Sequence, residues 1–227
     1  MGWGDWIRGV EIEPSIYAAD FARLGEQLES LLRAGARVFH IDVGDGHFIP
    51  PVTIGPIVLR SISPLVHGQG GVFDCHLMVE APERHFEQIR DAGGDTVTVH
   101  YETCPRLRDT AARARELGLQ VGLAFNPETE PDDAAAAATE AGVDFVLCMS
   151  IHPGYSGQEF MPEALDRVRV LRGLLPDSMH VQVDGGVDTE NVRSLHEAGA
   201  RAFVAGSAIF DEDDISEAYG RLVQAAA

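Results

Sequence analysis

Short apolar segments alternate along the chain with longer segments in which apolar and polar residues recur at helical spacing. The apolar segments are typical of buried strands. They cover residues 10–16, 38–43, 72–79, 96–102, 119–125, 144–150, 180–186 and 201–207. Between them, stretches such as FARLGEQLESLLRAG (21–35) place apolar residues at i, i+3, i+4 and i+7, which predicts helices with one buried face.

Several of these helical segments close on Ala-Gly, where glycine suits the left-handed conformation that ends a helix. The pairs are Ala34-Gly35, Ala92-Gly93, Ala141-Gly142 and Ala198-Gly199. Strand segments that recur every 25–35 residues or so, with a helix after each, predict parallel βα units.

We therefore predict a single (β/α)8 barrel domain over residues 1–227, preceded by a short N-terminal preface at 1–9, because 227 residues suit that fold. An open doubly wound sheet is the competing architecture. Such a sheet would more usually carry GxGxxG after its first strand, whereas the first strand here runs into PSIYAADF.

Composition narrows the class of protein. Of the 227 residues, 45% are hydrophobic, which suits one compact domain with a full core. No segment approaches the roughly 18–20 apolar residues of a membrane span, and the first residues lack the apolar run of a signal peptide. Three widely spaced cysteines favour reduced thiols. We expect a cytoplasmic protein with no membrane partner.

The charge balance excludes further classes. The formal net charge is −19, and all 17 basic residues are arginine. An acidic surface repels nucleic acid and anionic lipid, so neither is an expected partner. The absence of lysine excludes mechanisms that need a Schiff-base lysine or a lysine proton donor.

Ionisable side chains gather at three predicted strand ends. His40 and Asp42 are two apart on one strand and so share a face. His76 falls near the end of the third strand, and Asp184 ends the seventh. Active sites of (β/α)8 barrels lie at these ends. Singly, each residue is more typical of a helix cap or a structural hydrogen bond. Together, they predict a site for zinc, iron, manganese or cobalt.

Glycine-rich loops follow the last three predicted strands, in HPGYSGQEF (152–160), VDGGVDTENV (183–192) and VAGSAIF (204–210). Backbone N–H groups without neighbouring side chains can approach an anion closely. Barrel enzymes often bind phosphate with the loops after the seventh and eighth strands. Any one loop is explained as well by a tight turn, but the three together favour an anion site.

These segments resemble the ribulose-phosphate 3-epimerase family over nearly the whole chain, from Ile12 to about Tyr219. The matching motifs are EPSIYAADF, HIDVGDGHFIPPVTIGP, DCHLMVEAPERH, VTVHYETC, VGLAFNPET, VLCMSIHPGYSGQEF, VQVDGGV and VAGSAIF. The resemblance implies a TIM barrel of the ribulose-phosphate-binding type, one divalent metal ion, a phosphorylated ketose as substrate and a homo-oligomer.

The resemblance also implies roles for individual residues. It implies that His40, Asp42, His76 and Asp184 hold the metal, and that Asp42 and Asp184 are the acid/base pair that interconverts D-ribulose and D-xylulose 5-phosphates. The substrate-contacting and phosphate-contacting positions it implies are Ser15, Met78, Met149, Gly154, Gly157, Gly185, Gly186, Gly206 and Ser207.

Five positions depart from the family pattern. Gly44 stands where the family has methionine and Pro51 where it has asparagine. In the loop after the sixth strand, HPGYSGQ replaces NPGFGGQ, with substitutions at His152, Tyr155 and Ser156. Loss of the methionine predicts open space over the reacting centre, which allows a ketohexose 6-phosphate as an alternative substrate. A catalytically silent sugar-phosphate-binding protein is a further alternative. The orotidine-phosphate and hexulose-phosphate chemistries need a DxKxxD lysine that this chain lacks.

Overall fold

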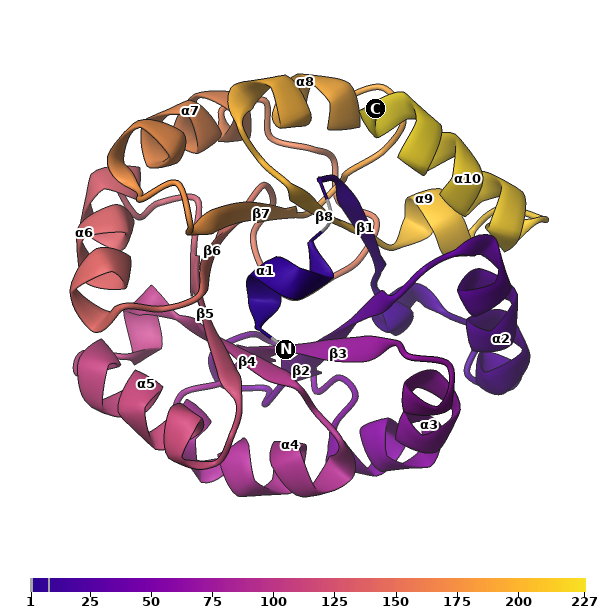
Figure 1. Cartoon of the computed structure of the whole chain (residues 1–227), viewed down its shortest axis with the longest axis horizontal. Coiled ribbons are helices and arrows are strands. Elements are labelled where there is room, and N and C mark those ends of the chain that lie inside the picture. The colour runs from indigo at the N-terminus through magenta and orange to yellow at the C-terminus, as the bar shows by residue number, and fades with distance from the viewer. Residues whose placement is uncertain (1, 8) are drawn as a thin grey trace.

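Eight parallel strands form the predicted barrel, in a computed structural model that describes residues 2–7 and 9–227 (Figure 1). They are β1 (Glu11–Pro14), β2 (Val38–Gly44), β3 (Val72–Met78), β4 (Thr96–His100), β5 (Gln120–Phe125), β6 (Phe145–Met149), β7 (His180–Asp184) and β8 (Ala202–Ala205). The sheet runs in the order β1-β8-β7-β6-β5-β4-β3-β2. A parallel bridge between Ser15 and His40 brings its two ends together, so the barrel is nearly closed.

Helices surround the barrel, as Figure 1 shows, while α1 lies over its centre in that view. The helices are α1 (Trp3–Trp6), α2 (Leu24–Ala34), α3 (Pro56–Gly68), α4 (Phe86–Ala92), α5 (Leu107–Glu116), α6 (Pro131–Ala141), α7 (Ala164–Leu174), α8 (Val192–Ala198), α9 (Ser207–Phe210) and α10 (Ile215–Ala226). Short 3₁₀ turns are η1 (Ile16–Ala18), η2 (Pro82–Arg84) and η3 (Tyr101–Thr103). None of the helices described is long and apolar enough to cross a bilayer.

The predicted helix ends are confirmed. Gly35, Gly93, Gly142 and Gly199 each follow the last residue of a helix with φ between 63° and 119°. A side chain is strained in this left-handed region, so glycine lets the chain leave each helix and turn directly into the next strand.

Strand side chains alternate between two environments. Those that point outward, such as Phe39, Ile41 and Phe73, are fully buried in the main apolar core with residues of the surrounding helices. Those that point into the barrel form layers along its axis. The layer nearest the strand starts is apolar. Toward the strand ends, polar side chains of β1, β2, β3, β4 and β7 lie beside apolar ones of β5 and β6.

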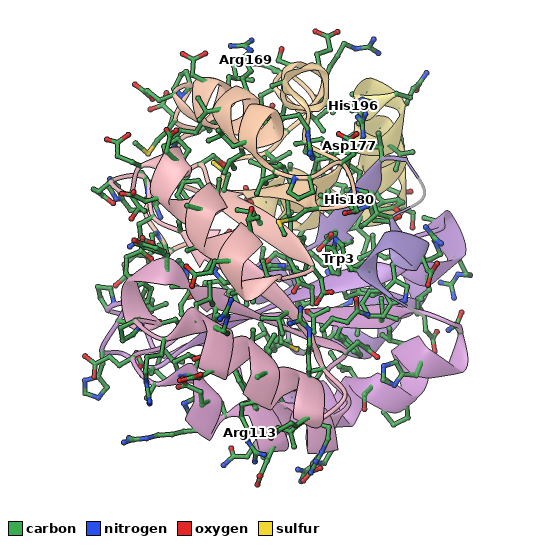
Figure 2. All side chains as sticks on the ribbon, turned by 60° about the vertical axis from the view of Figure 1, so that its left-hand side comes forward. Trp3, Arg113, Arg169, Asp177, His180 and His196 are labelled. Carbon is green, nitrogen blue, oxygen red and sulfur yellow. The ribbon has the colours of Figure 1, made fainter. Side chains whose placement is uncertain are left out.

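The N-terminal preface closes the apolar end of the barrel. Trp3 is 2% exposed and stacks on Phe145, with ring centroids 3.7 Å apart and planes at 14°. The same cluster contains Val38 and Ala202. A Cβ on Gly122 would lie 2.4 Å from the Phe145 ring, so the missing side chain on β5 makes room for Phe145. Figure 2 shows Trp3 near the middle of the molecule, with Arg113 and Arg169 at its rim.

The three cysteines are buried and unpaired, in agreement with the prediction of free thiols. Burial raises the pKa of Cys104 and of Cys148 to about 12. Both thiols therefore stay protonated at neutral pH, where they act as small apolar side chains with low reactivity.

Replacing Trp3 tests whether the preface is part of the folded barrel. Because Trp3 is buried against Phe145, we expect Trp3→Ala to lower the free energy of unfolding by about 3 kcal/mol. Trp6, which is partly exposed, is the matched control, and Trp6→Ala is expected to cost about 1 kcal/mol or less. Urea unfolding followed by far-UV circular dichroism measures both. A Trp3→Ala variant as stable as the unmodified protein would contradict a docked preface.

Candidate metal and active site

Four ionisable side chains meet at the strand ends, as the sequence predicts. His40 and Asp42 come from β2, His76 from β3 and Asp184 from β7. Parallel pairing of β2 with β3 places Asp42 beside His76. Both histidines are fully buried, Asp42 is buried and Asp184 is partly exposed. One ligand atom from each of the four lies within 4.8 Å of the others.

The spacing of these atoms fits a metal ion better than a set of hydrogen bonds. His40 Nε2 lies 3.3 Å from Asp42 Oδ1, 3.4 Å from His76 Nδ1 and 3.8 Å from Asp184 Oδ2. His76 Nδ1 lies 3.4 Å from Asp42 Oδ1 and 3.6 Å from Asp184 Oδ2. Good N–H···O bonds are shorter, at about 2.7–3.2 Å. Ligands about 2.0–2.2 Å from a tetrahedral ion lie roughly 3.3–3.6 Å apart.

The electrostatics of the cluster favour a cation. Burial acts to lower the pKa of His40 and of His76, but nearby carboxylates overcome it and raise both. Burial acts to raise the pKa of Asp42, yet the two imidazoles hold it well below its usual range. The carboxylates therefore stabilise positive charge at this position, whether as protons on the imidazoles or as a bound divalent ion.

A buried polar layer below the cluster holds His40 in place. His40 Nδ1 lies 3.0 Å from Asp74 Oδ2. Asp74 also accepts hydrogen bonds from the Thr96 and Thr98 hydroxyls and from the Gln182 amide. Burial acts to raise the pKa of Asp74, but these donors, His40 first, hold it below its usual range. An ionised Asp74 keeps the proton of His40 on Nδ1, which leaves Nε2 free to bind a metal.

Glu13 completes this layer. It is fully buried and accepts a hydrogen bond from the Gln182 amide at 2.7 Å. Burial and the Asp74 carboxylate raise the pKa of Glu13 well above its usual range, which favours its protonated form. Glu13, His40 and Asp74 also lie within ligand distance of one another. Because Asp74 is already saturated by hydrogen-bond donors, a proton network explains this second group better than a second ion.

Sequence reasoning missed the polar layer, and assigned no role to His100 and Glu102. A signal was present: on five strands, inward-facing polar residues recur two apart, in the pairs Glu13/Ser15, His40/Asp42, Asp74/His76, Thr98/His100 and Gln182/Asp184. Residues with this spacing share one face of a strand. Burial lowers the pKa of His100 to about 4, so its imidazole is neutral.

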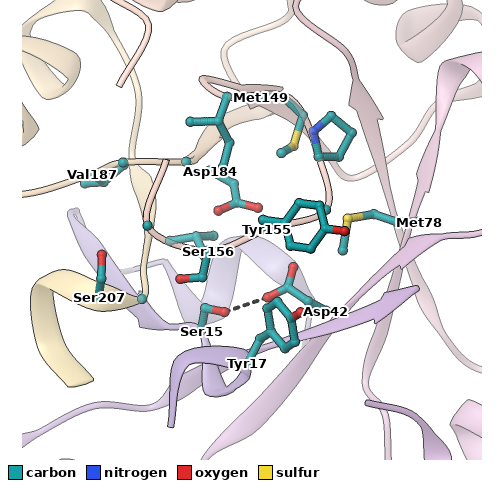
Figure 3. Close-up of a pocket in the computed structure, with 18 residues that line it drawn as sticks. Ser15, Tyr17, Asp42, Met78, Met149, Tyr155, Ser156, Asp184, Val187 and Ser207 are labelled. Carbon is teal, nitrogen blue, oxygen red and sulfur yellow. Dashed lines mark hydrogen bonds between the residues drawn. The ribbon is translucent and has the colours of Figure 1, made fainter. Parts of the chain in front are cut away.

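A pocket opens above the cluster (Figure 3). Of the residues predicted from the sequence, it is lined by Ser15, Asp42, Met78, Met149, Gly154, Gly157, Asp184, Gly185, Gly186, Gly206 and Ser207. The other two, His40 and His76, lie beneath it in contact with Asp42. Tyr17, Tyr155 and Ser156 also line the pocket, and sequence reasoning gave none of them a firm role.

The two aspartates face this pocket from different environments. Asp42 Oδ2 accepts a hydrogen bond of 2.6 Å from the Ser15 hydroxyl, drawn as the dashed line in Figure 3. Asp184 Oδ2 points to the cluster, and its Oδ1 forms no hydrogen bond with the residues described. One carboxylate is thus held by a hydroxyl, and the other keeps an oxygen free toward the pocket.

Glycines shape the far end of the pocket. Gly185 and Gly186 have φ of 120° and 62°. A Cβ on Gly185 would lie 2.4 Å from Ile151, and one on Gly186 would lie 2.8 Å from the backbone of Phe160. No side chain fits at either position. The N–H groups of Gly186 and Gly206 donate none of the loop or turn hydrogen bonds described, so they are available to an anion.

The prediction of open space at Gly44 is wrong. A Cβ on Gly44 would lie 2.5 Å from Ile49 Cδ1 and 3.0 Å from the Pro51 carbonyl. Ile49 is 1% exposed and comes from the loop between β2 and α3. The loop therefore folds back onto the end of β2 at Gly44 and occupies the space that a side chain there would need. Glycine in place of methionine does not enlarge the pocket at this position. His152, another departure, lies at the surface, with Nδ1 2.9 Å from Glu128.

Comparisons with known proteins agree on one family. The sequence profile of the "Ribulose-phosphate 3 epimerase family" matches residues 11–210. The chain is 41% identical to the ribulose-phosphate 3-epimerase of Escherichia coli K12, over 89% of this chain and 90% of that protein. It is 39% identical to that of Synechocystis over 93% and 92%, and 35% identical to that of Bacillus subtilis over 94% and 98%.

Similar solved structures share the fold. A 3-hexulose-6-phosphate synthase superposes with a TM-score of 0.74 at 19% identity, covering 96% of this chain and 100% of that one. Orotidine 5'-phosphate decarboxylase from Pyrococcus horikoshii gives 0.71 at 17% identity, covering 95% and 98%. At these identities the likeness concerns the barrel alone.

Metal binding by the cluster predicts a thermal shift. At a metal concentration about 1,000 times its Kd, a site found only in the folded state adds about 4 kcal/mol of stability. We expect Zn²⁺ or Co²⁺ to raise Tm by roughly 10 °C, a chelator to reverse the rise, and His40→Ala to abolish it. His67→Ala is the control, because His67 pairs with Asp95 outside the cluster. Equal shifts in both variants would place the ion elsewhere.

Proposed function

This chain belongs to the ribulose-phosphate 3-epimerase family, and from that membership we propose that it is a metal-dependent enzyme that interconverts D-ribulose 5-phosphate and D-xylulose 5-phosphate. As a member of that family it is an isomerase of carbohydrate phosphates. The observation that carries the proposal is the placement of Asp42 and Asp184 around one pocket, above two buried histidines and beside glycine-rich loops.

The reaction needs two proton-transfer groups. Epimerisation of a carbon next to a ketone removes its proton from one face and returns a proton to the other. Asp42 is on β2 and Asp184 is on β7, strands that are not neighbours in the barrel, and Figure 3 shows their carboxylates on different sides of the pocket. One carboxylate accepts the proton while the other, protonated, supplies the replacement, and their roles exchange in the reverse direction.

The two carboxylates have different surroundings. Ser15 donates to Asp42 Oδ2, which favours the ionised form of Asp42. Asp184 Oδ1 has no such donor among the residues described, so this oxygen is open to a substrate in the pocket.

The other residues of the site would hold the metal ion, line the pocket with apolar groups and receive the phosphate. His40, Asp42, His76 and Asp184 would hold the divalent ion, which acts when bound as a Lewis acid toward the oxygens beside the reacting carbon. Met78 and Met149 line the pocket with apolar thioethers, which donate no competing protons. The N–H groups around Gly186 and Gly206 would receive the phosphate, since the described pocket has no lysine or arginine in its lining.

Substitution of the two aspartates tests the acid/base assignment. Asp42→Asn and Asp184→Asn each keep the size of the side chain but remove the proton acceptor, so we expect kcat to fall by at least ~10²–10⁴-fold. Deuterium incorporation at C3 of ribulose 5-phosphate in D2O is the measurement. Asp166→Asn, on the exposed surface of α7, is the control. Wild-type exchange rates in both aspartate variants would disprove the assignment.

A panel of substrates tests the choice of sugar. Because Ile49 fills the space beside Gly44, we expect the pocket to favour a ketopentose 5-phosphate over a ketohexose 6-phosphate. One additional carbon changes binding by roughly 1–3 kcal/mol, or 10–200-fold in kcat/KM. Higher kcat/KM for the ketohexose phosphate would support the alternative substrate. Binding of metal and sugar phosphate without exchange at C3 would support a silent binding protein.

A further inference from the structure

The two histidines of the cluster are held from behind by different partners. His40 contacts a carboxylate directly, with Nδ1 3.0 Å from Asp74. Among the residues described, no carboxylate contacts His76 on the side away from the cluster. Its Nε2 lies 2.8 Å from Nε2 of another histidine, His100 on β4. The two ring planes are nearly parallel, at 19°, and the ring centroids are 4.9 Å apart.

His100 in turn contacts the carboxylate of Glu102. His100 Nδ1 lies 3.2 Å from Glu102 Oε2. The other oxygen of Glu102 accepts from the backbone N–H of Asn126 at 2.8 Å and from the Thr129 hydroxyl. His76 and His100 are fully buried, and the ring of Phe48 covers His100 with centroids 4.7 Å apart.

Only one arrangement of protons fits this chain of contacts. A neutral imidazole has a single N–H, and the Glu102 carboxylate is an acceptor only. His100 must therefore carry its proton on Nδ1 and accept at Nε2. His76 must then donate from its own Nε2, so the neutral form of His76 has its lone pair at Nδ1. Nδ1 is the atom of His76 that faces Asp42 and Asp184.

We propose that Glu102, acting through His100, is a positioning residue that fixes His76 in the tautomer able to bind a metal at Nδ1. This inference rests on the proposed metal site. In this arrangement both metal-binding histidines are oriented by a carboxylate. Asp74 orients His40 directly, and Glu102 orients His76 through the imidazole of His100. Such outer contacts typically change metal affinity by 10–100-fold.

Glu102→Gln separates this role from ordinary packing. Glutamine has the same shape but only one acceptor oxygen. It cannot accept from His100 on one side and from Asn126 and Thr129 on the other. If its NH₂ group faces His100, the proton order reverses and His76 loses its lone pair at Nδ1. Glu83→Gln is the matched control, since Glu83 accepts from the Thr110 hydroxyl and none of the hydrogen bonds or ion pairs described joins it to a histidine.

A second pair of variants keeps the charge constant. His100→Gln retains an oxygen that accepts from His76 Nε2, whereas His100→Leu has similar bulk and no acceptor. Glutamine and leucine are both uncharged, as a neutral imidazole is. The pair therefore tests loss of the hydrogen bond to His76 while the negative charge of Glu102 is kept.

Co²⁺ affinity is the readout, measured by competition with a chromophoric chelator on metal-free protein whose unfolding free energy is determined in parallel. We expect Glu102→Gln and His100→Leu to weaken Co²⁺ binding by 10–100-fold, with His100→Gln and Glu83→Gln within about threefold of the unmodified protein. The Co²⁺ visible spectrum should change in the weakened variants, because the Nδ1 ligand is lost.

Other outcomes overturn the proposal. Unchanged Co²⁺ affinity in Glu102→Gln, with only reduced stability, would make the contact a structural link between β4 and the loop after β5. Equal affinities in His100→Gln and His100→Leu would show that the hydrogen bond to His76 does not matter. If the unmodified protein binds no divalent ion at all, the metal site of the proposed function fails, and this inference fails with it.

Discussion

Burial of negative charge inside the barrel is the constraint on which the rest of the structure depends. Asp42, Asp74 and Glu13 are buried near the axis, and Asp184 is only partly exposed. An unpaired carboxylate in such a place costs several kcal/mol. The chain compensates in different ways: hydrogen-bond donors saturate Asp74, a raised pKa favours the neutral form of Glu13, and imidazoles face the two outer carboxylates. The charge that remains at the top of the barrel is best balanced by a divalent ion.

The layers of the interior follow from this constraint. Trp3 and Phe145 close the apolar end, so the polar layer above them is kept from water and its electrostatic interactions are strong. That layer orients His40 through Asp74, and the neighbouring His100 contacts His76. Rigid strands thus place the ligand atoms, while the loops beyond them, rich in glycine, form the pocket. In the proposed reaction, the rigid strands would hold the two aspartates in fixed positions beside the reacting carbon, and the glycine-rich loops would leave room for the phosphate.

The sequence predicted the features that depend on local pattern. Strand and helix periodicity led to the barrel, and spacing of two residues brought His40 and Asp42 to one face. Asp74 and Glu13 were missed because their spacing of two residues from His76 and Ser15 shows only a shared strand face, while the partners that bind them, Gln182 and the threonines of β4, lie on other strands. The error at Gly44 has a similar cause. The side chain that fills its space, Ile49, comes from a loop whose path no periodicity describes.

The most direct test of the account is the position of the metal itself. Crystals of protein loaded with Zn²⁺ or Co²⁺, measured at the absorption edge of that metal, locate it by anomalous scattering. We expect one strong peak about 2.0–2.2 Å from His40 Nε2, Asp42 Oδ1, His76 Nδ1 and Asp184 Oδ2. A peak at other side chains, or a cluster that stays protonated and without metal in loaded crystals, would contradict it.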